Sequence, residues 1–140
     1  MTATKLGFAG LVAGAVLALG GTASAHHSFS AEFDANKPIT VKGIVTKVEW
    51  TNPHVWFYVN VKDEASGEVT NWGAEMGPPH GLQRSGWRRE TLKIGEEVTV
   101  EGYLAKYGSN RLNARSVSLT ATGARPGQTL DANSSRGTTE

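Results

Sequence analysis

The residues that decide the fold read ITVKGIVTKVEWTNPHVWFYVNV, from Ile39 to Val61. In the last eight of these residues, apolar and polar or aromatic side chains alternate, and this period of two is typical of a β-strand with one buried face. The buried set is Val55, Phe57, Val59 and Val61, and the opposite set is His54, Trp56, Tyr58 and Asn60. We therefore predict a strand over residues 54–61 whose second face carries the two aromatic side chains.

The preceding segment, residues 39–50, is predicted to be a strand that changes its buried face. Ile39 and Val41 share one parity, whereas Ile44, Val48 and Trp50 share the other. A change of parity beside Gly43 indicates a bulged or strongly bent strand, and such a strand can serve two sheets of one small barrel.

The rest of the pattern predicts three further strands, over residues 68–76, 96–104 and 111–119. Between the first two of these, Gly77-Pro78-Pro79 favours a short helix over residues 80–85, which ends at Gly86 and is followed by a core residue, Trp87. The predicted fold class is therefore all-β with one short helix. Its order, β-β-β-α-β-β, is typical of a five-stranded OB-like (oligonucleotide/oligosaccharide-binding) barrel.

The chain divides into four predicted segments. Residues 1–25 have the features of a secretory signal peptide, because Lys5 precedes an uncharged apolar stretch that ends at Ala23-Ser24-Ala25. Residues 26–38 are expected to form an N-terminal arm, residues 39–119 the OB-like domain, and residues 120–140 a disordered tail. We expect a periplasmic protein that keeps no membrane anchor after the signal peptide is cleaved.

Charge and composition exclude several functions. With 14 Lys and Arg against 13 Asp and Glu, the chain lacks the positive charge that nucleic acid binding requires. It contains no cysteine, which excludes disulfides, thiolate metal sites and a lipid-modified N-terminal cysteine. None of the common catalytic motifs occurs, so we do not predict an enzyme.

Four segments together resemble a known family. They are His26-His27-Ser28-Phe29, residues 49–54 (EWTNPH), the stretch from Gly81-Leu82 to Gly86-Trp87, and residues 92–100 (LKIGEEVTV). This combination is similar to small exported bacterial proteins of the domain of unknown function 6152 family. The resemblance covers residues 26–119 and implies an exported β-domain, but no activity.

Histidines at the predicted mature N-terminus suggest a metal site. Cleavage after Ala25 makes His26 the N-terminal residue, whose amine and Nδ1 can chelate copper together with other histidines. Cleavage after Ala23 instead places His26 third, where the amine, two amides and the imidazole can form a square-planar site. The candidate metal ligands are His26, His27, His54 and His80.

Three of these histidines also have a structural interpretation. His26 and His27 can be solvated residues of a flexible arm, and His54 can be a turn residue that is hydrogen-bonded to the backbone. Glu75 and Met76 are possible additional ligands near His80, although Met76 has the parity of a core residue.

The aromatic face of the second strand is the other candidate site. Trp56 and Tyr58 can contact a partner protein or a small ligand by stacking. The alternative is that Trp56 packs under the N-terminal arm through Phe29 or Phe33. A basic cluster around Trp87 is expected to form local ion pairs at the surface; it consists of Arg84, Arg88 and Arg89.

The sequence thus predicts an exported periplasmic binding module and leaves two hypotheses for its ligand. In the first, it binds copper, its one candidate cofactor, through the N-terminal histidines. In the second, it is a metal-free adaptor that binds an envelope protein or a small ligand through Trp56 and Tyr58.

Overall fold

The computed structural model describes residues 29–132. The predicted signal peptide, His26, His27 and residues 133–140 of the predicted tail lie outside this range. The chain divides into two compact units, Met1–Ala31 and Glu32–Glu140, and the strands described within residues 29–132 all belong to the second unit. No helix in the described part of the chain is long and apolar enough to cross a membrane.

The described fold is mostly β with one short helix between the third and fourth strands, as the sequence predicts. In chain order the elements are β1 (Phe33–Glu49), β2 (Trp56–Lys62), β3 (Val69–Glu75), α2 (Pro79–Arg84), β4 (Glu97–Ala105), β5 (Arg111–Leu119) and β6 (Gln128–Asp131). The order differs from the prediction by the sixth strand.

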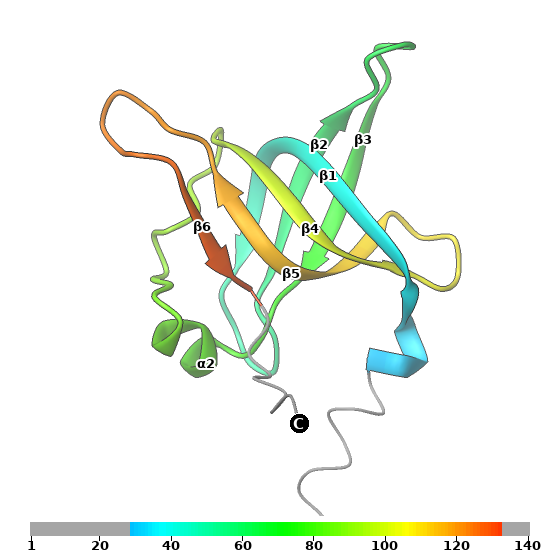
Figure 1. The fold of residues 1–140 in the computed structure, drawn as a ribbon, viewed down its shortest axis with the longest axis horizontal. Helices are drawn as coiled ribbons and strands as arrows, with labels where there is room; N and C mark the ends of the chain where they lie inside the picture. Colours follow the sequence, from blue (N-terminus) through cyan, green and yellow to red (C-terminus); the bar gives the residue numbers. More distant parts are fainter. Residues whose placement is uncertain (1–28, 133–140) are drawn as a thin grey trace, which may run out of the picture. The chain divides into compact units, whose positions relative to one another are not determined.

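The strands form one sheet in the order β3-β2-β1-β4-β5-β6 (Figure 1). These neighbouring strands are antiparallel. In addition, the end of β3 pairs in parallel with the start of β5, through residues 73–75 and 111–113. Because of this extra pairing, β1, β2, β3, β5 and β4 form a closed circuit of hydrogen-bonded neighbours.

The first strand is longer than predicted and changes its face at a different residue. It begins at Phe33, so residues 33–38 of the predicted arm belong to β1, where Phe33 pairs with Ala105. The change of face lies between Val45 and Lys47, where the register with β2 shifts, and not at Gly43–Ile44. Ile44, predicted to be buried, is 41% exposed.

Gly43 explains why the change of face comes later. It keeps the buried parity of Val41 and Val45, and there it approaches β2 so closely that a Cβ atom would lie 2.9 Å from the carbonyl carbon of Asn60. The extra residue is Thr46, whose hydroxyl donates a hydrogen bond to the backbone oxygen of Tyr58. Gly43 is therefore required for close strand packing, and the bulge follows it.

The core is filled from the inner face of the strands and from α2. Of the predicted buried set of the second strand, Val55, Phe57 and Val59 are buried, whereas Val61 is only partly buried and packs against the core. In the third strand, Ala74 and Met76 are buried and Trp72 is partly buried. The predicted helix is also confirmed. It buries Leu82, and Gly86 has a φ of +93° directly before the fully buried Trp87.

The prediction of a disordered tail from residue 120 is wrong over residues 128–132. β6 pairs with the part of β5 that β3 does not reach, from Ser116 to Leu119. The indole Nε1 of Trp87 donates a 2.7 Å hydrogen bond to the carbonyl oxygen of Asp131, and Ala132 is buried. The segment contains only one large apolar residue, Leu130, so these backbone interactions leave almost no trace in the hydrophobic pattern.

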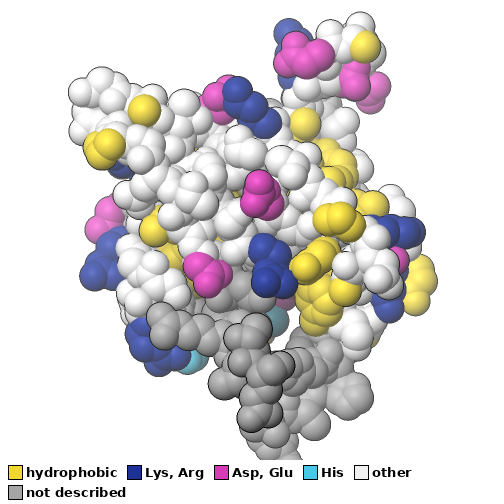
Figure 2. Space-filling view, viewed as in Figure 1, with side chains coloured by type: hydrophobic (Ala, Val, Ile, Leu, Met, Phe, Trp, Pro, Cys, Tyr) yellow, Lys and Arg dark blue, Asp and Glu magenta, His cyan; other side chains and the backbone are white. Residues whose placement is uncertain are grey.

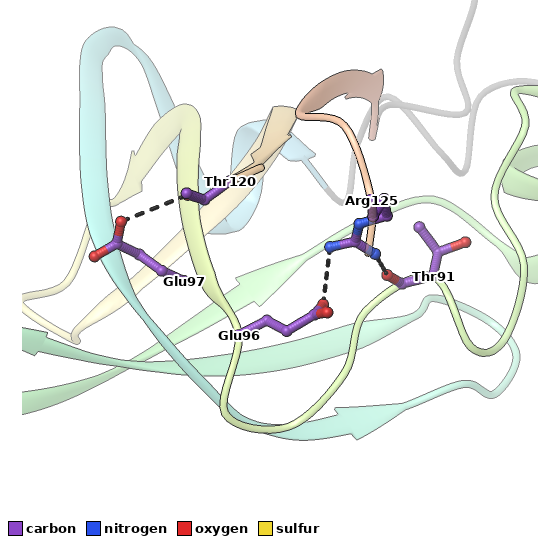
Figure 3. Close-up of polar contacts among 5 residues, drawn as sticks. All are labelled: Thr91, Glu96, Glu97, Thr120 and Arg125. Atoms are coloured by element: carbon purple, nitrogen blue, oxygen red, sulfur yellow. Dashed lines mark hydrogen bonds and ion pairs between the residues drawn. The ribbon is translucent and has the colours of Figure 1, made fainter. Parts of the chain in front are cut away.

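The loop between β5 and β6 is fastened to the loop before β4 by Arg125 (Figure 3). Its guanidinium donates to the carboxylate of Glu96 at 3.0 Å and to the backbone oxygen of Thr91 at 3.1 Å. Nearby, the hydroxyl of Thr120 contacts the carboxylate of Glu97. These contacts join the loop that leads into β6 to the segment around the start of β4.

The substitution Gly43→Ala tests the close approach of β1 to β2. Because the new methyl group meets the backbone of Asn60, we expect the free energy of unfolding to fall by about 1–3 kcal/mol. Urea denaturation measures this change. Gly123→Ala is the matched control, since no atom lies within 4 Å of a Cβ there, and we expect a change within about 0.5 kcal/mol. Equal effects of the two substitutions would contradict this account.

Candidate functional site

The outward-facing residues of four strands form two adjacent rows. Register partners in neighbouring strands point to the same side of a sheet, and the inward parity is fixed by the buried Phe57, Ala74 and Leu112. The first row contains Glu49, Trp56, Glu75 and Asn113. The second row contains Lys47, Tyr58, Gly73 and Arg111. We call these eight residues, with His54 and Glu32 beside them, the outer face.

At one end of the outer face, His54 is held by a carboxylate. Nδ1 of His54, which precedes β2, contacts the carboxylate of Glu75 at the end of β3. The two segments are kept together by backbone hydrogen bonds from Val55 to Gly77 and from Met76 to Val55. Glu75 is 7% exposed, whereas the side chain of His54 is 36% exposed. The pair therefore presents an oriented imidazole at the surface, above a buried acid.

Burial raises the pKa of Glu75 above its ordinary value of 4.5. The contact with His54 and a hydrogen bond from the side chain of Asn113 act in the opposite direction, and the nearby carboxylate of Glu32 raises the pKa further. The interactions with His54 and Asn113 thus offset only part of the cost of burying the ionised carboxylate of Glu75.

The ring of Trp56 is covered by an arginine. The guanidinium carbon of Arg111 lies 4.5 Å from the ring centroid, and Nη1 of the same side chain is 2.9 Å from the carboxylate of Glu32. Phe33, one of the two arm residues considered as a cover for Trp56, is buried and paired with β4. The cation over the Trp56 ring comes from β5.

The ring of Tyr58 has a similar arrangement. Nζ of Lys47 lies 5.4 Å from the ring centroid and pairs with Glu49, which also accepts a 3.1 Å hydrogen bond from the Tyr58 hydroxyl. The hydrogen bonds from Lys47 and Tyr58 lower the pKa of Glu49. In turn, the hydrogen bond to Glu49 and its negative charge raise the pKa of Lys47. Burial, followed by the hydrogen bond to Glu49, raises the pKa of Tyr58.

Gly73 provides space for both rings. A Cβ atom at this position would lie 3.4 Å from the ring of Tyr58 and 3.6 Å from that of Trp56. Since a side chain at residue 73 would stand between them, its absence lets the two rings lie against the same stretch of β3.

Of the four predicted metal ligands, only His54 and His80 lie within the described residues. His26 and His27 lie outside the described residues, His54 is paired with Glu75, and His80 is exposed in the first turn of α2. Within residues 29–132, no group of three His, Cys, Asp or Glu side chains is arranged to hold a metal ion. Met76, considered as an additional ligand, is a core residue.

Two arginines of the basic cluster near Trp87 donate hydrogen bonds to backbone carbonyl groups. Arg88 donates to the carbonyl oxygens of Gln83 and Trp87, and Arg89 donates to that of Trp50. For these two residues, the described hydrogen bonds do not support the predicted ion pairs. Figure 2 shows Lys and Arg side chains interspersed with Asp and Glu on the side that it views.

Sequence reasoning found Trp56, Tyr58 and His54 but missed Arg111, Asn113 and Glu32. The first three lie in one alternating segment, whose two faces can be read directly. The others reach the site only through the parallel pairing of β3 with β5, or through the start of β1. Local periodicity contains no signal for these three residues, because their places in the site depend on contacts between distant parts of the chain.

Replacement of Glu75 by Gln tests its buried charge. Because the pKa of Glu75 is raised in the folded state, its favourable contribution is fully present below about pH 4.5 and is lost as the pH rises through the raised pKa. Gln cannot ionise, so the stability of Glu75→Gln relative to the parent should increase over that pH range and then level off. Urea denaturation between about pH 4 and pH 8 measures the difference.

Glu49→Gln is the matched control with the opposite sign. The pKa of Glu49 is lowered, so its contribution is present above about pH 4.5 and is lost as the pH falls. This variant should be less stable than the parent at neutral pH, and the difference should shrink in acid. If the stability difference from the parent changed with pH in the same direction for both variants, the opposite pKa shifts assigned to Glu75 and Glu49 would be disproved.

Comparison with known proteins adds the family but no activity. A comparison with curated proteins finds no match. The model of a family of unknown function, DUF6152, matches residues 13–113, which is most of the chain and includes β1 to β4 and the start of β5. The chain therefore belongs to the DUF6152 family.

Proposed function

We propose that this protein is an exported, periplasmic binding module whose OB-like barrel contacts an envelope protein or a small ligand through the outer face. The signal-peptide features of residues 1–25 support the export. The single observation that carries the binding proposal is the concentration of two aromatic rings, paired cations and a buried acid on one continuous face.

The closed circuit of strand pairings supports an OB-like barrel. Register partners can be followed outward from Pro38 in β1, through one residue of each of the other four strands, back to Glu49 in the same β1. The intermediate residues are Tyr103, Asn113, Glu75 and Trp56. The path returns further along the strand it left, and this stagger is the property that lets tilted strands close.

The position of the aromatic residues supports ligand binding at this face. In OB barrels the surface of the second and third strands commonly receives the ligand, and stacking on aromatic rings contributes to affinity. Trp56 and Tyr58 lie on β2, directly beside Gly73 and Glu75 of β3. Their side chains are neither fully buried nor fully exposed, so part of each ring is accessible to a partner.

Copper binding through the mature N-terminus is a second candidate function. His26 and His27 would be the primary ligands, and His54 and His80 would be additional ones. The observation that favours it is the contact of His54 Nδ1 with Glu75, because metal-binding histidines usually donate their other ring N–H to a carboxylate or carbonyl group. Within residues 29–132, Nδ1 is the only ring nitrogen of His54 with a partner.

Site-specific photo-crosslinking tests binding through the outer face. A benzophenone amino acid replaces Tyr58 in the exported protein, which is then irradiated in its native cells. We expect one dominant adduct, whose mass identifies a protein or a small ligand, and we expect Trp56→Ala to reduce its yield about tenfold.

The same residue at position 103 is the matched control. Tyr103 also lies on the outside of the sheet with an arginine, Arg115, 5.5 Å from its ring. It pairs with Asn113 at the edge of the outer face, but it belongs to β4, and β3 and β5 lie between it and the β2 residues Trp56 and Tyr58 along the register path. Equal crosslinking from positions 58 and 103, or an adduct that is insensitive to Trp56→Ala, would argue against the outer face as the binding site.

Intact-mass spectrometry of the periplasmic protein tests the copper proposal. Under denaturing conditions it gives the N-terminus, and under native conditions with Cu(II) it gives the metal stoichiometry. We expect a chain that starts at His26 or Ser24 and retains one copper ion, and we expect the double substitution of His26 and His27 by Ala to abolish retention. Absence of tight copper binding by the parent would refute this candidate and leave the outer face as the binding site.

A further inference from the structure

We infer that the outer face binds a cationic partner, namely a segment of another protein that presents Arg or Lys side chains. This inference rests on the proposed function, because it specifies the ligand of the same face. It is based on three observations: what covers the rings, how the charges of the face balance, and how weakly the resident cations are held.

Both aromatic rings are already occupied by cations of the chain itself. Arg111 lies over Trp56 and is paired with Glu32, and Lys47 lies over Tyr58 and is paired with Glu49. Each ring therefore contributes its negative π-face, and each has a carboxylate that binds the charge above it. The same arrangement of ring, cation and carboxylate occurs twice in adjacent rows, so the face has a repeated chemistry that suits positively charged groups.

The charges of the face leave an excess of acid. Three carboxylates, Glu32, Glu49 and Glu75, are opposed by two permanent cations, Lys47 and Arg111. Of these acids, Glu75 is the buried one, and among the described ion pairs its partner is His54 and not a lysine or an arginine. A cation placed over Trp56 would lie close to Glu32, which pairs with Arg111 at that ring, and would stabilise its ionised form.

The resident cations can be replaced by those of a partner. The side chains of Lys47 and Arg111 are 59% and 46% exposed. Exposed ion pairs contribute little to stability, and so do cation–π contacts at exposed sites. An incoming Arg or Lys side chain can therefore take the position over a ring while the resident side chain turns into solvent, with no buried group left unpaired.

Other ligand classes fit this face less well. An acidic segment would find two cations, but it would also bring its carboxylates next to three others, one of them buried. A neutral ring that stacks on Trp56 or Tyr58 would displace a cation without replacing its charge. Only a cationic side chain preserves the interactions that both rings already make.

Titration with two matched peptides tests the inference. The probes are an acetylated and amidated Gly-Arg repeat peptide and the corresponding Gly-Glu repeat peptide. They are added to ¹⁵N-labelled full mature protein, and the amide of Gly73 and the indole N–H of Trp56 are followed by NMR. We expect the Gly-Arg peptide to shift both signals in a salt-dependent manner and the Gly-Glu peptide to leave them unchanged.

Removal of the resident cation gives the sharper test. Arg111→Ala uncovers Trp56 and frees Glu32, so the Gly-Arg peptide should bind about two- to fivefold more tightly than it binds the parent. Arg115→Ala is the matched control, because it removes an exposed arginine of the same strand that lies over Tyr103 instead, and we expect no change. Glu32→Gln should weaken binding. Arg111 and Glu32 are at the surface, so these variants should fold, as the NMR spectra will show.

Two results would overturn the inference. If the Gly-Glu peptide binds and Arg111→Ala weakens it, the face binds anions; the proposed binding function then survives, and only the ligand class is wrong. If neither peptide shifts Gly73 or Trp56, a cationic ligand is excluded. In that case, crosslinking from position 58 decides separately whether the outer face binds anything.

Discussion

The parallel pairing of β3 with β5 is the contact on which the rest of the structure depends. It involves only three residues of each strand, yet it joins the two ends of the antiparallel order β3-β2-β1-β4-β5. Closed in this way, the strands leave a single inner face that is filled by valines, Phe57, Leu112 and the α2 residue Leu82. The same pairing sets Arg111 and Asn113 beside Gly73 and Glu75, so the core and the outer face are fixed by one short set of hydrogen bonds.

The sequence was most informative where the chain needs only local regularity. The alternation in β2, the helix before Gly86 and the burial of Trp87 follow from side-chain period and backbone preference, and all three are confirmed. It was least informative where structure depends on distant partners. Ile44 is exposed because the bulge follows Gly43, and β6 exists because β5 has an unpaired edge and Trp87 has an indole N–H to satisfy.

In the candidate site, too, local features could be predicted from the sequence and long-range contacts could not. Trp56 and Tyr58 were identified from a single strand, and His54 from its position before that strand. The cation over Trp56, however, is Arg111, which lies more than fifty residues away in the sequence, and the rings of Trp56 and Tyr58 both depend on the space left by Gly73. A surface that looks aromatic in the sequence is therefore a charged surface in the folded protein, and this changes which ligands it can accept.

The brevity of the β3–β5 pairing also limits how the protein can change during evolution. Arg111 and Asn113 directly follow the turn between β4 and β5, and alternate residues of a strand point to opposite faces. If an insertion of one residue in that turn moved the strand along by one position, Leu112 would face solvent and the two polar residues would face the core. The residues at the tip of this hairpin can vary, but their number is constrained, because it determines which residues of β5 face the core and which belong to the outer face.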